Sequence, residues 1–231
     1  MPTPGLFVVG TDTDVGKTQV AAAIVRSLMA AGRRVGVYKP VASGCGAATA
    51  QGSDPRTLWD AAGRPLEPAD VCPQTFAAAI APVAAARAEG RRVDEGLLRT
   101  GLDRWRTVSD LVIIEGAGGL FSPVGESTLV VDLAREFSFP LVIVDAARLG
   151  AVGRTLVTVR AARAEGLRVA AVVLSHTVPL SPETGPTSTT AIVREAAADL
   201  TRHLATIPVV ILGHGDSRMP PGIDWEQAAT S

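Results

Sequence analysis

The chain has 231 residues, of which 47% are apolar and only 4% aromatic, and its formal net charge is −1, which predicts a single domain over residues 1–231 with a large core. The charge balance and the lack of a basic cluster argue against partners such as nucleic acid or an anionic membrane. Because no apolar run approaches about 18 residues and no signal peptide is evident, we expect a cytoplasmic protein in which Cys45 and Cys72 are free thiols.

Short apolar runs alternate with longer alanine-rich segments along the chain, a pattern typical of α/β proteins. Six runs predict strands, and in chain order they are Leu6–Val9, Val35–Tyr38, Leu111–Ile114, Leu141–Val144, Val169–Leu174 and Val209–Leu212. Most of these runs are apolar at successive positions, as expected of central strands that are covered on both sides. We therefore predict a doubly wound, mostly parallel sheet with helices on both faces.

Helical spacing of apolar residues predicts three clear helices, which are Thr18–Ala31, Val152–Glu165 and Thr189–Leu204. The first two stop at glycines, and the third has a cap among residues 187–189. Residues 76–106 predict two helices broken near Arg91-Arg92, with Asp94 as a cap of the second. Residues 177–186 contain three prolines and predict a surface loop, whereas the last twelve or so residues have too weak a pattern for a prediction.

The segment from Gly10 to Thr18 lies between the first predicted strand and the first predicted helix, and it reads Gly-Thr-Asp-Thr-Asp-Val-Gly-Lys-Thr. Backbone N–H groups at such a helix N-terminus form a cradle for phosphate. Gly16 lets the main chain approach the phosphates, Lys17 can reach the β and γ oxygens, and the Thr18 hydroxyl can bind Mg²⁺. The loop is one residue longer than the common pattern, and the alternative is a glycine-containing helix entry that binds nothing. The motif predicts a nucleotide-dependent protein.

Two further motifs follow predicted strands, at the edge of the sheet where ligands bind in doubly wound folds. Lys39, in Tyr-Lys-Pro-Val-Ala-Ser-Gly, is suited to neutralising a transferring phosphoryl group or an anionic substrate, unless it is a solvated lysine at a strand end. Glu115, in Glu-Gly-Ala-Gly-Gly, closes a buried strand, so we expect it to face a cation such as Mg²⁺ unless it caps a nearby helix. Asp54 precedes Pro55 and either caps a helix or supplies another oxygen to magnesium, and these residues alone favour the cap.

These three motifs, in this order and at these separations, resemble the signature segments of the dethiobiotin synthetase family over residues 5–175. The extra residue in the first loop is characteristic of that family. The resemblance implies a P-loop NTPase fold and an ATP-dependent enzyme that uses Mg²⁺ and closes the ureido ring of dethiobiotin from 7,8-diaminopelargonate and CO₂. It also implies a homodimer with the substrate near the subunit interface. The chemistry requires no nucleophilic side chain, because a substrate carbamate attacks the γ-phosphate and the second amine opens the resulting mixed anhydride.

The resemblance also implies a role for each matching residue, and it favours Asp54 as a metal ligand rather than a cap. The implied catalytic residues are Thr11, Lys17 and Lys39, and the implied ligands of Mg²⁺ are Thr18, Asp54 and Glu115. The implied nucleotide site comprises Asp14, Val15, Gly16, Lys17, Thr18, Glu115, Gly118 and Ser175. The implied substrate site comprises Thr11, Lys39, Ser43, Leu149 and Gly150.

Two segments depart from the family pattern. Ser175-His176 stand where the family often has an Asn-Asp pair that reads adenine, so nucleoside triphosphates other than ATP stay open, and His176 either stacks on the base or is solvated. Gly153-Arg154 stand where the family usually has Asn-His, which leaves the grip on the diamine across the dimer open. The alternative functions are a related P-loop amide-forming ligase with another substrate, and a partitioning-type ATPase switch. The switch is disfavoured because the loop lacks an extra lysine near its start and no terminal amphipathic helix is evident.

Overall fold

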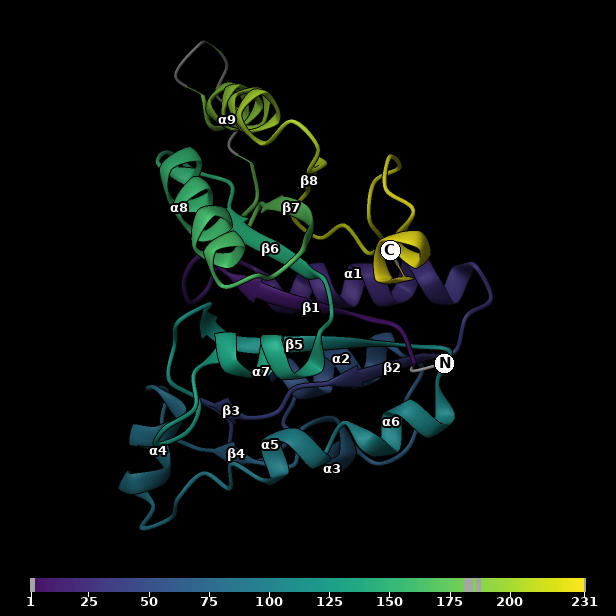
Figure 1. The fold of residues 1–231 in the computed structure, drawn as a ribbon, viewed down its shortest axis with the longest axis vertical. Coiled ribbons are helices and arrows are strands. Elements are labelled where there is room, and N and C mark those ends of the chain that lie inside the picture. Colours follow the sequence, from purple (N-terminus) through teal and green to yellow (C-terminus); the bar gives the residue numbers. More distant parts are fainter. Residues whose placement is uncertain (1–2, 181–184, 186–187, 231) are drawn as a thin grey trace.

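The computed structural model describes residues 3–180, 185 and 188–230. Its centre is a parallel sheet of six strands in the order β2-β5-β1-β6-β7-β8 (Figure 1). The strands are β1 Gly5–Gly10, β2 Val35–Tyr38, β5 Leu111–Gly119, β6 Leu141–Ala146, β7 Val169–Ser175 and β8 Val209–Leu212. Every predicted strand is confirmed, and the largest difference is that β5 continues beyond Ile114 to Gly119.

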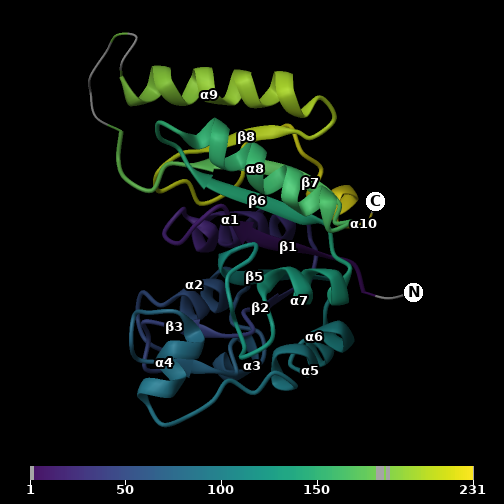
Figure 2. The ribbon, with the colours of Figure 1, turned by 60° about the vertical axis from the view of Figure 1, so that its left-hand side comes forward.

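Helices cover both faces of this sheet, as the sequence predicts (Figures 1 and 2). One face carries α1 Lys17–Ala30, α2 Asp54–Ala61 and α10 Trp225–Thr230, and the other carries α7 Val130–Phe137, α8 Ala151–Ala164 and α9 Thr189–Leu204. Right-handed crossovers between parallel strands produce this arrangement, because the chain moves in opposite directions from β1 to β2 and from β5 to β6. The fold is therefore doubly wound.

Apart from α2, the segment between β2 and β5 forms a separate layer beside the edge strand β2 (Figure 2). It contains a small parallel pair, β3 Ala42–Ser43 and β4 Thr75–Phe76, and the short helices α3 Pro68–Val71, α4 Pro82–Ala88, α5 Leu97–Thr100 and α6 Asp103–Val108. The prediction of two helices over residues 76–106 is wrong, because Gly96 and Gly101 flank a third, one-turn helix. The break near Arg91-Arg92 is confirmed, and Asp94 Oδ1 accepts a hydrogen bond from Leu97 N at the start of α5.

The long helices agree with the sequence patterns to within a residue. Gly32 and Gly166, which follow α1 and α8, have positive φ as expected after a helix end, and Ser188 caps α9 by accepting a hydrogen bond from Ala191 N. The final residues do form a short helix, α10, with Trp225 buried at its start. Half of the loop predicted over 177–186, residues 181–184 and 186, lies outside the described residues.

The core lies between the sheet and the two helical layers. Phe7, Ile24, Ile113 and Trp105 are fully buried. Alanines on the sheet-facing side of α1 let that helix pack closely, which keeps its N-terminus beside the carboxyl ends of β1 and β5. Both cysteines are free, as predicted. Among the described residues, no helix combines the length and apolarity needed to cross a membrane.

Candidate active site

The loop between β1 and α1 forms one wall of the site. Gly16 has a φ of +91°, a left-handed conformation that favours glycine, and a Cβ there would lie 2.4 Å from Ser175 Oγ. The helix begins at Lys17, so its first N–H groups, which lack partners inside the helix, lie at this loop. Lys17 is buried and its Nζ donates to Asp12 O at 3.0 Å. Burial lowers the pKa of Lys17 although the charge of Glu115 opposes this. A phosphate oxygen would be a stronger partner for this ammonium than the neutral carbonyl.

An ion-pair cluster lies at the carboxyl end of β2, beside the neighbouring strand β5, and comprises Lys39, Asp54 and Glu115. Lys39 Nζ lies 2.5 Å from Glu115 Oε1 and 3.0 Å from Asp54 Oδ2. Thr18 Oγ1 donates to the same Glu115 oxygen at 2.9 Å. Because Lys39 and Glu115 are only 3% and 1% exposed, Lys39 is not a solvated lysine. Glu115 accepts hydrogen bonds from side chains instead of capping a helix.

Burial and charge act in opposite directions on this cluster. Burial alone would lower the pKa of Lys39, but the attraction of Glu115 and Asp54 outweighs it and the pKa is raised. For Glu115, burial raises the pKa more than the Lys39 charge lowers it. For Asp54, burial is outweighed by the pairing with Lys39, so the pKa is lowered. Lys39 is therefore held as an ammonium between two carboxyl groups.

Asp54 does not cap α2. Ser53 is the N-cap, and its Oγ accepts a hydrogen bond from Arg56 N at 3.4 Å. Asp54 is the first residue of the helix, with its carboxylate on Lys39. The capping prediction from the residues alone is wrong, because the neighbouring serine takes the cap position and leaves the aspartate for the site.

The same cluster offers ligands that suit Mg²⁺. This ion binds oxygen, usually through one or two carboxylates together with water and substrate phosphates, and Thr18, Asp54 and Glu115 supply such oxygens. Glu115 Oε2 is buried and has no hydrogen-bond partner in the described part of the chain. A buried carboxylate oxygen without a donor is costly unless a cation or water reaches it. The residues present therefore fit a magnesium ion that arrives with a nucleotide.

Two cavities meet at Lys17 and Asp54. The first, of about 430 Å³, is lined among others by Asp14, Gly16, Lys17, Thr18, Asp54, Glu115, Ser175 and residues 213–216. The second, of about 380 Å³, is lined among others by Asp14, Lys17, Lys39, Ser43, Asp54, Gly118, Ser122 and Pro123. A third cavity of about 390 Å³ includes Thr11 and shares Ser122 and Pro123 with the second. The structure thus brings most of the sequence-predicted residues to one connected region.

Three of the predicted residues line none of these cavities. The Val15 side chain is fully buried in the core, so only the backbone of this residue could contact a nucleotide. Leu149 is 80% exposed, and Gly150, with a φ of +87°, precedes α8. Within one copy of the chain, Leu149 and Gly150 do not contribute to the walls around Lys17.

Two parts of this region were not predicted from the sequence. Asp145, fully buried near the end of β6, accepts a hydrogen bond from Thr11 Oγ1 at 2.7 Å and pairs with Arg154 Nε at 3.1 Å. It follows an apolar run as Glu115 does, so the same strand-end argument could have found it. Residues 213–216, after β8, line the first cavity but carry no recognisable motif.

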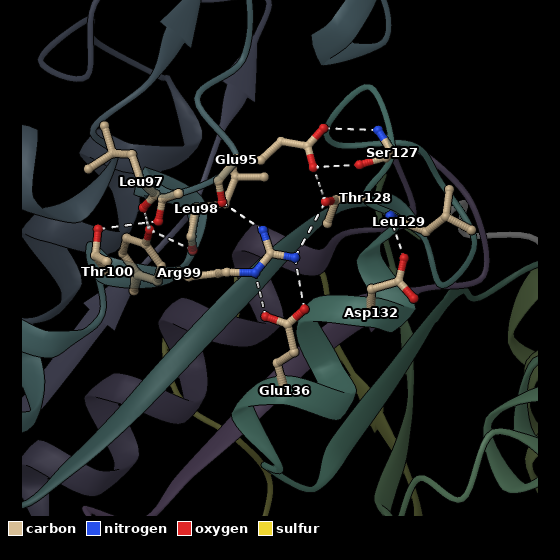
Figure 3. Close-up of polar contacts among 12 residues, drawn as sticks. Glu95, Leu97, Leu98, Arg99, Thr100, Ser127, Thr128, Leu129, Asp132 and Glu136 are labelled. Carbon is tan, nitrogen blue, oxygen red and sulfur yellow. Dashed lines mark hydrogen bonds and ion pairs between the residues drawn. The ribbon is translucent and has the colours of Figure 1, made fainter.

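A polar cluster holds the loop after β5 that carries Ser122 and Pro123 (Figure 3). The Glu95 carboxylate accepts hydrogen bonds from Ser127 N and Oγ, both at 2.9 Å, and from the Thr128 hydroxyl. Arg99 joins this cluster to Glu136 of α7 through two nitrogens, at 2.5 and 2.8 Å. The loop between the second and third cavities is therefore tied to both α5 and α7.

Comparison with known proteins gives consistent matches over most of the chain. Residues 4–213 match a family model described as an AAA domain. The chain is 47% identical over 184 residues to the ATP-dependent dethiobiotin synthetase BioD of Rhodopirellula baltica, covering 74% of this chain and 72% of that protein. It is 42% identical over 192 residues to the protein of the same name from Anaeromyxobacter dehalogenans strain 2CP-C, covering 82% and 84%. Among solved structures, pNOB8 ParA bound to nonspecific DNA superposes with a TM-score of 0.53 and 13% identity over 94% of this chain and 89% of that one, which shows a shared fold alone.

Proposed function

Since the chain belongs to the family of ATP-dependent dethiobiotin synthetases, we propose that it closes the ureido ring of dethiobiotin from 7,8-diaminopelargonate, CO₂ and ATP, a step of biotin biosynthesis. The observation that carries this proposal is the convergence of Lys17, Lys39, Asp54 and Glu115 where two cavities meet. One cavity suits a nucleoside triphosphate on the loop, and the other suits a substrate that must approach the same phosphate.

The proposed reaction uses the site to position groups and to stabilise charge. One amine of the substrate adds to CO₂ and loses a proton, which gives a carbamate, and a carbamate oxygen then attacks the γ-phosphorus of ATP while ADP leaves. The second amine attacks the carbonyl carbon of the mixed anhydride and loses a proton as phosphate leaves, and the ring closes. Lys17 and Lys39 balance the negative charge that develops on the transferring group. Thr11 and Ser43 contact the diamine or its carbamate.

Mg²⁺ completes the proposed site through Thr18, Asp54 and Glu115. When bound, it neutralises charge on the nucleotide phosphates. The unpartnered Glu115 Oε2 and the oxygen donors around it support this assignment. Lys39 already lies on Glu115 and Asp54, so it holds both carboxyl groups beside the place where the ion would bind.

The nucleotide base is proposed to lie toward the carboxyl end of β7. Ser175, His176 and residues 213–216 line that end of the first cavity. Burial lowers the pKa of His176 although Asp216 opposes this, which favours a neutral ring that can stack on a base. The family name supports ATP, and CTP is the informative competitor because the usual Asn-Asp pair is replaced.

A homodimer in the cytoplasm, with residues 1–231 acting as one domain, completes the proposal. Leu149 and Gly150 would then contact the substrate of the partner subunit. Leu149, Val157 and Phe121 are 80%, 69% and 47% exposed. Phe121 and Val157 line the same third cavity as Thr11, and apolar side chains exposed side by side in this way support an interface between two copies.

The deciding experiment measures phosphate release with diaminopelargonate, bicarbonate, Mg²⁺ and either ATP or CTP. We expect release to require the diamine, and the product to carry the ureido ring by mass spectrometry. A monoamino analogue is the matched control, because it can form a carbamate but cannot close the ring. Phosphate release that ignores the diamine would instead indicate a switch ATPase or a ligase with another substrate.

A further inference from the structure

Asp145 is a buried carboxylate for which the proposed reaction has no use. Its Oδ1 accepts from Thr11 Oγ1 at 2.7 Å, Ala146 N at 2.8 Å and Arg154 Nε at 3.1 Å. Its Oδ2 accepts from the same Arg154 nitrogen at 3.2 Å and from Thr155 Oγ1 at 3.3 Å. Asp145 and Thr155 are fully buried. Burying a charge is costly unless donors compensate for it, and the donors around Asp145 also fix the groups that they belong to.

The surroundings of Asp145 determine whether the Thr11 hydroxyl donates or accepts the hydrogen bond that it makes with this carboxylate. Arg154 Nε and Ala146 N can only donate, and the guanidinium balances the carboxylate charge. The single hydroxyl proton of Thr11 is therefore placed on Asp145, at 2.7 Å. The Thr11 backbone is fixed as well, because its N–H donates to Val144 O at 2.9 Å. Oγ1 then offers only its lone pairs to the cavity of about 390 Å³ that Thr11 lines.

We propose that Asp145 and Arg154 are positioning residues that hold Thr11 as a hydrogen-bond acceptor for an N–H of the diamine substrate. This inference rests on the proposed function. An acceptor-only hydroxyl pairs with an amine or carbamate N–H and disfavours a carboxylate or phosphate oxygen, which also can only accept. The site thereby divides recognition in two, because Lys17 and Lys39 take anionic oxygens whereas Thr11 takes the nitrogen.

Three variants test whether Asp145 acts on substrate binding through Thr11 or only stabilises the fold. Thr11→Val removes the acceptor, and Asp145→Asn keeps the shape but can turn an amide N–H toward Oγ1, which lets the hydroxyl reverse its polarity. Thr155→Val is the matched control, because it removes another hydroxyl from Asp145 at a buried position that lines none of the cavities described above. Melting temperatures show which variants fold.

We expect Thr11→Val and Asp145→Asn each to raise the diamine KM about tenfold, the loss typical of one hydrogen bond, with less than about a twofold change in the ATP KM. The same loss should be seen in diamine binding measured by calorimetry, and Thr155→Val should show neither effect. The double variant Thr11→Val with Asp145→Asn should be no worse than Thr11→Val, since both changes remove one interaction.

Three results would overturn the inference: an unchanged diamine KM in Asp145→Asn, an equal rise in Thr155→Val, or additive losses in the double variant. If Asp145→Asn does not fold, Arg154→Lys decides, because it keeps the charge but loses the Nε contact to both carboxylate oxygens. A diamine KM equal to wild type in that variant also overturns the inference. Failure of the proposed function looks different, because the unaltered protein would then release no phosphate in response to the diamine.

Discussion

Replacing Lys39 with methionine separates the catalytic and structural contributions of this side chain. The change keeps the aliphatic stem and removes the charge that lies 2.5 Å from Glu115 Oε1. Removing one partner of a buried ion pair costs about 3–5 kcal/mol, and Glu115 qualifies as buried because it is 1% exposed. For a chain of this size, each kcal/mol lowers Tm by about 2–4 °C, so we expect Tm to fall by roughly 6–20 °C. Phosphate release should fall by about 100-fold or more, as when one preorganised charge partner is removed.

The stability loss should depend on pH in a direction that Glu115 sets. Burial already raises the pKa of Glu115 against the opposing charge of Lys39, and the raise grows when that charge is removed. A group whose pKa is raised by folding stabilises the fold below its unfolded pKa and loses that contribution as pH rises through the folded value. In Lys39→Met, Glu115 therefore takes up a proton in acid and the deficit shrinks. We expect the difference in Tm from wild type to be smaller at about pH 5 than at about pH 8.

Thermal denaturation at both pH values, together with the phosphate-release assay, tests this reasoning. The double variant Lys39→Met with Glu115→Gln is the control, because it removes both charges and leaves a neutral side chain in the buried position. Its Tm should recover in part while phosphate release stays lost. A wild-type Tm for Lys39→Met at the higher pH, or a double variant no more stable than the single one, would refute the argument.

Further predictions concern the phosphate loop, the metal site and the polar cluster around Glu95. Gly16→Ala should weaken ATP binding by about tenfold or more and lower Tm, because the new Cβ would lie 2.4 Å from Ser175 Oγ. Gly32→Ala is the control, since Gly32 also has a positive φ but has open space around it, and this variant should lower Tm only. Equal ATP affinities in the two variants would contradict this prediction. Thr18→Val should raise the Mg²⁺ concentration needed for half-maximal activity by about tenfold and also lower Tm, because the Thr18 hydroxyl donates to the buried Glu115 carboxylate; an unchanged magnesium titration would remove Thr18 from the metal site. Glu95→Gln should reduce the loss of Tm on acidification, because hydrogen bonds from Thr128 and Ser127 lower the pKa of Glu95, so that the ionised carboxylate stabilises the fold above its unfolded pKa. Identical acid profiles would show that the Glu95 carboxylate contributes nothing to stability.

The parallel sheet could be predicted because its strands are apolar at successive positions and its longer helices have clear spacing and glycine ends. The layer between β2 and β5 could not, because β3 and β4 are two residues each and α5 is a single turn, too short for periodicity to be read. Helix α10 was missed for the same reason, since one buried tryptophan and one alanine are too few to define a face.

The same distinction, between features set by neighbouring residues and features set by the folded chain, applies to the candidate site. Gly16, Lys17 and Thr18 could be placed because their spacing along the chain sets their geometry. Asp145 could have been singled out as a carboxylate that follows an apolar run, but its pairing with Thr11, 134 residues away, could not, because only the folded sheet brings the two together. The choice between cap and site for Asp54 also needed the structure, since the sequence does not say whether a serine or the aspartate beside it occupies the cap.

The position of β5 in the sheet has a consequence for synthesis on the ribosome. It lies between β1 and β2 although it follows both in the chain, pairing Val8 with Glu115 on one side and Tyr38 with Ile114 on the other. A nascent chain that ends before residue 111 carries the phosphate loop but lacks β5, the strand that joins β1 to β2. It also lacks Glu115, the buried carboxylate that pairs with Lys39. Ser175 and residues 213–216 line the same cavity as the phosphate loop, so nucleotide has no complete pocket to bind, and cannot fully stabilise the growing chain, until nearly all of the protein has left the exit tunnel.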